Sequence, residues 1–199
     1  MYLAFLVEQV ANHSSSLCGW NSANTQMRSV FARQALPMNW DFAESNPFSS
    51  SSGSYNNLYE RMVKGFAALG AGTPGVAEQA DAATQNISAD KIVSTDPPYY
   101  DNIGYADLSD FFYVWMRRAL QPIFPKVLST MATPKDAELV ATPHRHGGRE
   151  EAESFFLTGM SAVVHNLALN AHGAFPVSIY YAFKQSETED IGTSREALK

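Results

Sequence analysis

Residues 91–99 read Lys-Ile-Val-Ser-Thr-Asp-Pro-Pro-Tyr, and this stretch decides which fold the chain is expected to adopt. The apolar, β-branched run over 91–95 predicts a strand that ends at Asp96. Pro97 and Pro98 fix their own φ angles and have no N–H to donate, so the loop is stiff and its carbonyls are free to accept. In open α/β sheets, ligands bind beyond the carboxyl ends of the strands. The stretch therefore predicts a strand followed by a rigid loop at a ligand-binding edge.

Helical and strand patterns alternate on the C-terminal side of this loop. Apolar spacing predicts a helix over about 108–120, with a core-facing side made of Leu108, Phe111, Phe112, Trp115 and Ala119. It predicts a longer helix over about 150–172, with Phe156, Met160, Val163, Val164 and Leu167 on one face. Residues 175–183 are rich in β formers and predict a second strand. This alternation favours an α/β fold with a parallel sheet.

The N-terminal side of the loop has a different character. A helix is expected near residues 3–10, followed by irregular polar chain as far as a serine-rich loop at 49–54, and a second helix is expected over 55–69. We therefore expect an N-terminal helical and irregular segment over 1–54 and a catalytic domain over 55–199. Residues 70–75 match the letters G-x-G-x-x-G, but a helix precedes them, so they indicate a helix end and turn and not a dinucleotide site.

Composition limits the classes of function. The chain has 199 residues, 45% of them apolar, and a net charge of −6, which argues against a generally basic nucleic-acid coat but not against a local basic face. Cys18 is the only cysteine, so no disulfide can form within the chain, and a cytoplasmic setting is expected. The short apolar start meets Glu8 and predicts neither a signal peptide nor a membrane span. His144 and His146 lack a third ligand, so no metal site is expected.

The chemistry of the proline loop suits methylation of an exocyclic amine. Such an amine is a poor nucleophile, because its lone pair is delocalised into the base. The Asp96 carboxylate and the Pro97 carbonyl would hold both amino hydrogens and favour the tetrahedral nitrogen that attacks. The reacting base must leave the duplex, and the ring of Tyr99, with Tyr100 as a second candidate, would hold it. The alternative interpretation is a proline-rich turn that caps a strand, with Tyr99 packed in the core.

These residues also resemble a known family. The tetrapeptide Asp96-Pro97-Pro98-Tyr99 resembles motif IV of amino-group DNA methyltransferases. The runs 95–103 (TDPPYYDNI) and 105–115 (YADLSDFFYVW) are similar to adenine-specific DNA methylases of bacteria and archaea, and the likeness extends upstream to residues 16–18, 34–38 and 40–44. The resemblance implies a partial Rossmann-like methyltransferase sheet with flanking helices, S-adenosylmethionine as cofactor and DNA as partner. Adenine N6 is the implied target, and cytosine N4 is a close variant.

The resemblance also implies roles for individual residues. Asp96, Pro97, Pro98 and Tyr99 would bind the amine, and Asp81 resembles the acidic position that contacts the adenine of the cofactor. The alternative for Asp81 is a solvated turn residue.

Several further residues are candidates for contact with the nucleic acid. Tyr100 and Asn102 follow the motif, and Arg145 and Arg149 belong to a compact basic loop whose cations would fix the DNA backbone. The alternative for the arginines is a flexible surface loop.

One part of such an enzyme is missing from the sequence. The chain contains no Phe-x-Gly-x-Gly loop of the kind that lies under the methionine end of the cofactor. The missing loop has three possible explanations. The sequence belongs to a longer gene product, it is a truncated remnant, or a second chain supplies the loop. The competing function is therefore a non-catalytic fragment, derived from a methylase, that binds nucleic acid or a protein partner.

Overall fold

The computed structural model describes residues 1–40, 42, 45–70, 72–101 and 103–181. Helices and short strands follow one another along the chain, so the architecture is mixed α/β. In chain order the elements are α1 (Tyr2–Ser14), β1 (Trp20–Asn21), β2 (Gln26–Met27), α2 (Tyr55–Ala68), β3 (Ser94–Thr95), α3 (Tyr105–Leu120), α4 (Pro143–His146), α5 (Arg149–Asn170) and β4 (Ser178–Ile179).

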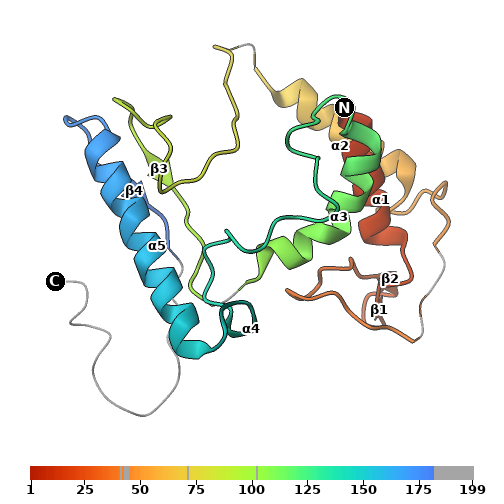
Figure 1. The fold of residues 1–199 in the computed structure, drawn as a ribbon. Helices are drawn as coiled ribbons and strands as arrows, with labels where there is room; N and C mark the ends of the chain where they lie inside the picture. Colours follow the sequence, from red (N-terminus) through yellow and green to blue (C-terminus); the bar gives the residue numbers. More distant parts are fainter. Residues whose placement is uncertain (41, 43–44, 71, 102, 182–199) are drawn as a thin grey trace.

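The elements gather around two small apolar cores. α1 packs against both α2 and α3, while α5 packs against α4 on the other side of the molecule (Figure 1). The Asp90 N–H donates to the Asn170 carbonyl at 2.8 Å, which ties the end of α5 to the chain before β3. The first core is formed by Tyr113, Leu120 and Leu128, and the second by Ala141, Ala152 and Phe156. Because α1 contacts α2 and α3, the expected boundary at residue 54 separates helices that pack together, and the two-part division stays a prediction.

β3 and β4 pair in parallel, with Ser94 opposite Ser178 and Thr95 opposite Ile179. The backbone N–H of Tyr180 donates to the Thr95 carbonyl at 2.8 Å. The parallel pairing agrees with the alternation of the sequence, but both strands are shorter than the predicted ranges 91–95 and 175–183, and residues 182–183 lie outside the described part. Pairing ends after Thr95 because the two prolines that follow Asp96 have no N–H to donate. At the other end, a turn closed by Phe175 N–H on the His172 carbonyl precedes β4.

The long helices lie close to where the periodicity predicts them, but one predicted core face is wrong. In α3 the buried residues are Ala106, Tyr113 and Leu120, whereas Trp115 is 40% exposed. The face changes because α1 and the chain around Leu128 cover the Tyr113 side of the helix. Phe111 and Phe112 are half-buried, and their rings pack against Phe31. Within α5, Phe156 and Leu167 are buried as predicted, while Val164 is exposed.

Among the described residues, no helix combines the length and the apolar character that crossing a membrane requires.

Candidate functional site

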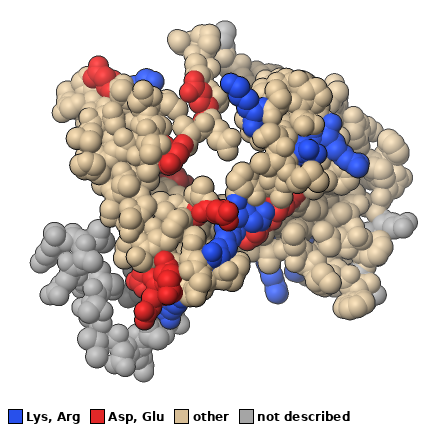
Figure 2. Space-filling model, viewed as in Figure 1, with Lys and Arg blue, Asp and Glu red and all other residues tan. Residues whose placement is uncertain are grey.

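A cleft of about 890 Å³ lies where the loop after β3 faces α5 and the chain over 133–139. Asp81, Asp96, Pro97 and Pro98 all line it, so residues selected separately from the sequence share one cavity. The charged residues that line it are Asp81, Asp96 and Glu138, and its described lining contains no lysine, arginine or histidine. Figure 2 shows the face hollowed between the parts that carry α5 and α3, with both acidic and basic groups around the opening. Because its described lining is acidic, the cleft favours a cationic ligand.

The Asp96 carboxylate is exposed, and Tyr99 holds one of its oxygens. The Tyr99 hydroxyl donates to Asp96 Oδ1 at 2.6 Å, and this hydrogen bond, with burial second, raises the pKa of Tyr99. Pro97 and Pro98 are half-buried between strand and cleft. The structure does not match the alternative in which Tyr99 packs in the core, because its ring is only half-buried, with the ring of Tyr181 edge-on at 5.3 Å.

Tyr100 turns away from this loop. Its φ of 44° lies in the left-handed region, and its ring packs edge-on against Phe156 in the second core. Its carbonyl accepts from the Ala141 N–H at 3.0 Å. The positive φ therefore redirects the chain after Tyr99, and Tyr100 fixes the loop to the core. Its predicted contact with nucleic acid stays a prediction.

Asp81 lies in a turn that α5 holds in place. Its Oδ1 accepts from the Ala83 N–H at 2.9 Å, which is the Asx turn expected of a turn residue. The side chain of Asn166 then donates to the carbonyls of Ala82 and Gln85, at 3.0 and 2.9 Å. The turn interpretation thus fits the local geometry, and Asp81 is at the same time exposed at the acidic cleft.

Apolar side chains of α5 form the opposite wall of the cleft. Phe155, Met160 and Val163 line it, and Gly159 lies where the helix approaches Leu139. A Cβ placed on Gly159 would come within 2.3 Å of Leu139 Cδ1. A glycine is therefore needed there unless Leu139 moves.

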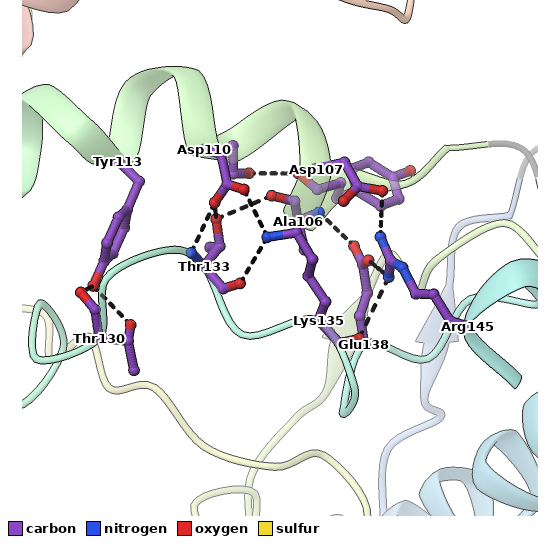
Figure 3. Close-up of polar contacts among 11 residues, drawn as sticks. Ala106, Asp107, Asp110, Tyr113, Thr130, Thr133, Lys135, Glu138 and Arg145 are labelled. Carbon is purple, nitrogen blue, oxygen red and sulfur yellow. Dashed lines mark hydrogen bonds and ion pairs between the residues drawn. The ribbon is translucent and has the colours of Figure 1, made fainter.

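Glu138 connects the cleft to the N-terminus of α3 (Figure 3). One of its oxygens accepts from the Ala106 N–H at 2.8 Å, which satisfies a free amide of the first helical turn. The other oxygen pairs with Arg145 at 2.6 Å, and Arg145 pairs in turn with Asp107 at 2.5 Å. Burial lowers the pKa of Arg145, but the hydrogen bonds from its guanidinium to Glu138 and Asp107 outweigh it, so the pKa is raised.

A second ion pair holds the same loop one turn farther along α3. Lys135 Nζ lies 2.6 Å from Asp110 Oδ2, and both the N–H and the hydroxyl of Thr133 donate to Asp110 Oδ1. Burial would raise the pKa of Asp110, but the hydrogen bonds from Lys135 and Thr133 outweigh it and keep that pKa below its usual value. Residues 133–138 are thus tied to α3 at successive points and form a fixed wall of the cleft.

The two arginines predicted to contact the DNA backbone differ in their exposure. Arg145 is committed to two carboxylates and its side chain is 8% exposed, whereas Arg149 is exposed at the first residue of α5. Asn102 lies outside the described residues. The structure therefore gives Arg145 a structural role in the loop, and its contact with the DNA backbone stays a prediction. Over the part of the chain that is described, no three histidine, cysteine, aspartate or glutamate residues gather as metal ligands would.

Sequence reasoning did not single out Glu138, Leu139, Gly159 or Asn166. Each acts on a partner distant in sequence: Glu138 on residue 106, Asn166 on residues 82 and 85, and Gly159 on Leu139. No local motif surrounds them, so only the folded arrangement identifies them. Comparison with protein-family models, with curated proteins and with solved structures finds no match to this chain.

Proposed function

We propose that this protein transfers a methyl group to an exocyclic amino group of a DNA base, adenine N6 in the first instance, with S-adenosylmethionine as the donor. One observation carries the proposal. The exposed Asp96 carboxylate lies on a double-proline loop at the carboxyl end of a parallel strand, beside a cleft, with a tyrosine hydroxyl bound to it.

The loop offers the acceptors that an amine requires. A carboxylate has two oxygens with about four lone-pair sites, so the bond from Tyr99 to Oδ1 leaves capacity for an amino hydrogen. The Pro97 carbonyl would accept the second hydrogen. Holding both hydrogens localises the nitrogen lone pair on the nitrogen, and the Asp96 charge stabilises the cation that forms. The prolines hold these two acceptors in a fixed geometry, which lowers the entropic cost of orienting the amine.

An extruded base would rest on Tyr99. Its ring is half-buried, so one part is supported by the protein while another remains open to a ligand. Tyr181, edge-on at 5.3 Å, limits how far the ring can move. Base–aromatic stacking typically contributes about 1–3 kcal/mol, enough to offset part of the cost of unstacking the base.

The residues of the cleft fit the cofactor. Its volume of about 890 Å³ is within the range of ligand pockets, and its lining combines an apolar wall from α5 with three carboxylates. S-adenosylmethionine supplies a methyl group on a positively charged sulfur, and an acidic lining suits a cation. Asp81 would accept from the hydroxyl or amino groups of the nucleoside half, and Phe155, Met160 and Val163 would cover its apolar surface.

The carboxylates of the cleft would attract the cationic cofactor and repel the phosphates of DNA. With Asp81 and Asp96 at the cleft, DNA phosphates would be repelled from its interior and would lie outside it. Arg149, exposed at the start of α5, is a candidate for such an outer contact.

A non-catalytic binding fragment is the second candidate function. The observation that favours it is the absence from the sequence of a Phe-x-Gly-x-Gly loop. Such a fragment would keep the fold and the cleft, and would bind nucleic acid or a partner without methyl transfer.

Mass spectrometry of nucleosides separates the two functions. The protein is incubated with unmethylated DNA and S-adenosylmethionine, and the DNA is digested to nucleosides. The proposal expects N6-methyladenine; N4-methylcytosine would keep the reaction class and change the base. The absence of both, together with no heat of cofactor binding in calorimetry, would favour the binding fragment.

A further inference from the structure

A second cleft, of about 560 Å³, lies far from the first in sequence, and its described lining carries an arginine where the first cleft carries carboxylates. It is formed by the β1–β2 hairpin, the C-terminal end of α1 and the serine-rich loop before α2. Its titratable lining residues are His13 and Arg28, and its described lining contains no carboxylate. The remaining polar lining consists of hydroxyl and amide side chains, such as Ser51, Ser52 and Gln26. These groups favour an anion, which the acidic cleft beside Asp96 would repel.

The walls of this cleft are held in place by the backbone. The Arg28 N–H donates to the Gly19 carbonyl at 2.7 Å, which extends the pairing of β1 with β2. Across the cleft, the Asn57 side chain donates to the carbonyls of Ser50 and Ser51, at 3.0 and 2.5 Å. The position of a Cβ on Gly53 would lie 3.6 Å from His13, so the serine-rich loop packs directly on α1. The site is therefore formed before any ligand arrives.

Arg28 keeps its side-chain donors for a ligand, and His13 forms part of the wall beside it. The Arg28 side chain is exposed, and no described carboxylate pairs with it. His13 Nδ1 must donate to the Gln9 carbonyl at 2.9 Å, because a carbonyl only accepts. The ring is thereby fixed, and Nε2 of the neutral ring is an acceptor, so the donors for an anion come from Arg28. A guanidinium on an exposed, ordered hairpin is well suited to a phosphate, which it binds through two parallel N–H groups.

An aromatic ring lines the same cleft. Trp20 in β1 is 49% exposed, although a tryptophan normally buries most of its surface. Two more aromatic residues of the same segment are strongly exposed, Trp40 at 93% and Phe48 at 75%. Exposed aromatic rings interspersed with arginines are typical of surfaces that stack the bases of single strands.

We propose that this cleft binds one nucleotide of a single-stranded nucleic acid, with the phosphate on Arg28 and the base against Trp20. A free inorganic anion would use Arg28 but would leave Trp20 without a role. The inference does not depend on the proposed methyl transfer, because a non-catalytic chain would keep this site.

Fluorescence anisotropy with two labelled probes tests the site. One probe is an oligothymidylate of about eight nucleotides, and the other is an abasic strand of equal length, both at about 50 mM salt because the contact with phosphate weakens as salt rises. The oligothymidylate should bind at least about tenfold more tightly than the abasic strand. Trp20→Ala should remove that difference, and Arg28→Gln should weaken binding of both probes.

Matched variants serve as controls. Trp115→Ala removes a tryptophan of similar exposure on α3, and Arg118→Gln removes an exposed arginine on the same helix, neither of which lines this cleft. Both should bind as the unmodified protein does. The proposal is overturned if the abasic strand binds as tightly as the oligothymidylate, or if Arg28→Gln, an exposed substitution that leaves the core intact, binds both probes normally.

Discussion

At the scale of single residues, Tyr99 would have two separable functions in the proposed reaction. Its hydroxyl donates to the Asp96 carboxylate and would orient it, and its ring would offer a face to the base. Tyr99→Phe removes only the first, so the rate of methyl transfer should fall about tenfold with little change in DNA affinity. Tyr99→Ala removes both and should also weaken binding of the substrate. Equal rates of methyl transfer by Tyr99→Phe and by the unmodified protein would show that the hydroxyl does not position Asp96.

The burial of Glu8 leads to a prediction about stability that does not depend on the proposed function. The residue is 8% exposed, its Oε1 has no hydrogen-bond partner among the described residues, and burial raises its pKa from 4.5 to about 7. Between these two values the folded chain binds more protons than the unfolded chain. The free energy of unfolding that depends on Glu8 is therefore highest below pH 4.5 and falls as the pH rises to about 7.

Replacing the ionisable carboxyl group of Glu8 should remove this dependence of stability on pH. Glu8→Gln should raise the free energy of unfolding by about 1–3 kcal/mol near pH 8 and leave it unchanged near pH 4. Urea denaturation at both pH values measures the difference. A variant that is equally or less stable at the higher pH would mean that the Glu8 carboxylate is solvated in the folded protein.

At the scale of elements, the Glu138–Arg145–Asp107 chain fixes the loop over 133–146 to α3. Arg145→Met leaves Glu138, which is 11% exposed, without its cation, and should cost about 2–3 kcal/mol of stability. A double-mutant cycle with Glu138→Gln should show coupling of about 1 kcal/mol or more. Lys135→Met is the matched control, because its partner Asp110 is 32% exposed and its loss should cost less. If the effects of Arg145→Met and Glu138→Gln on the free energy of unfolding were additive, the two side chains would not be coupled.

Substitution of Gly159 tests how closely α5 approaches Leu139 in the wall of the cleft. Alanine is favoured over glycine in a helix by about 1 kcal/mol, but here its Cβ would overlap Leu139. Gly159→Ala should therefore lower the melting temperature in the unmodified chain and raise it in a Leu139→Ala background. The direction of the change in melting temperature, and not its size, tests whether Leu139 limits the approach of α5. Stabilisation by Gly159→Ala in both backgrounds would show that Leu139 does not limit the approach.

The elements themselves were predictable to different degrees. The helices over 105–120 and 149–170 follow from apolar spacing, because a helix is closed by contacts within four residues. The lengths of the two strands were overestimated. Each strand depends on a partner about 80 residues away, and the prolines after β3 and the turn before β4 end the pairing. The exposure of Trp115 could not be foreseen, because α1 decides which face of α3 is covered.

At the scale of the whole molecule, the described linings of the two clefts differ in charge, so each cleft suits a different ligand. The cleft beside Asp96 is acidic and suits a cationic cofactor, while the cleft beside Arg28 suits a phosphate. The loop after β3 could be predicted from the sequence, since four adjacent residues carry that signal, while the role of Asp96 stays a prediction. The sequence could not predict Glu138, Gly159 or the Arg28 cleft, since these sites form only when distant segments meet. The Rossmann-like sheet remains a proposal beyond the parallel pair formed by β3 and β4.

Transfer of tritium from labelled S-adenosylmethionine to DNA, compared between Asp96→Ala and Asp136→Ala, tests the central claim most directly. Asp136 is an exposed acidic residue outside the lining of the acidic cleft, so its removal matches the change in charge without touching the proline loop. We expect Asp136→Ala to transfer label as the unmodified protein does and Asp96→Ala to transfer none. Equal transfer by both variants would contradict a catalytic role for the Asp96 carboxylate.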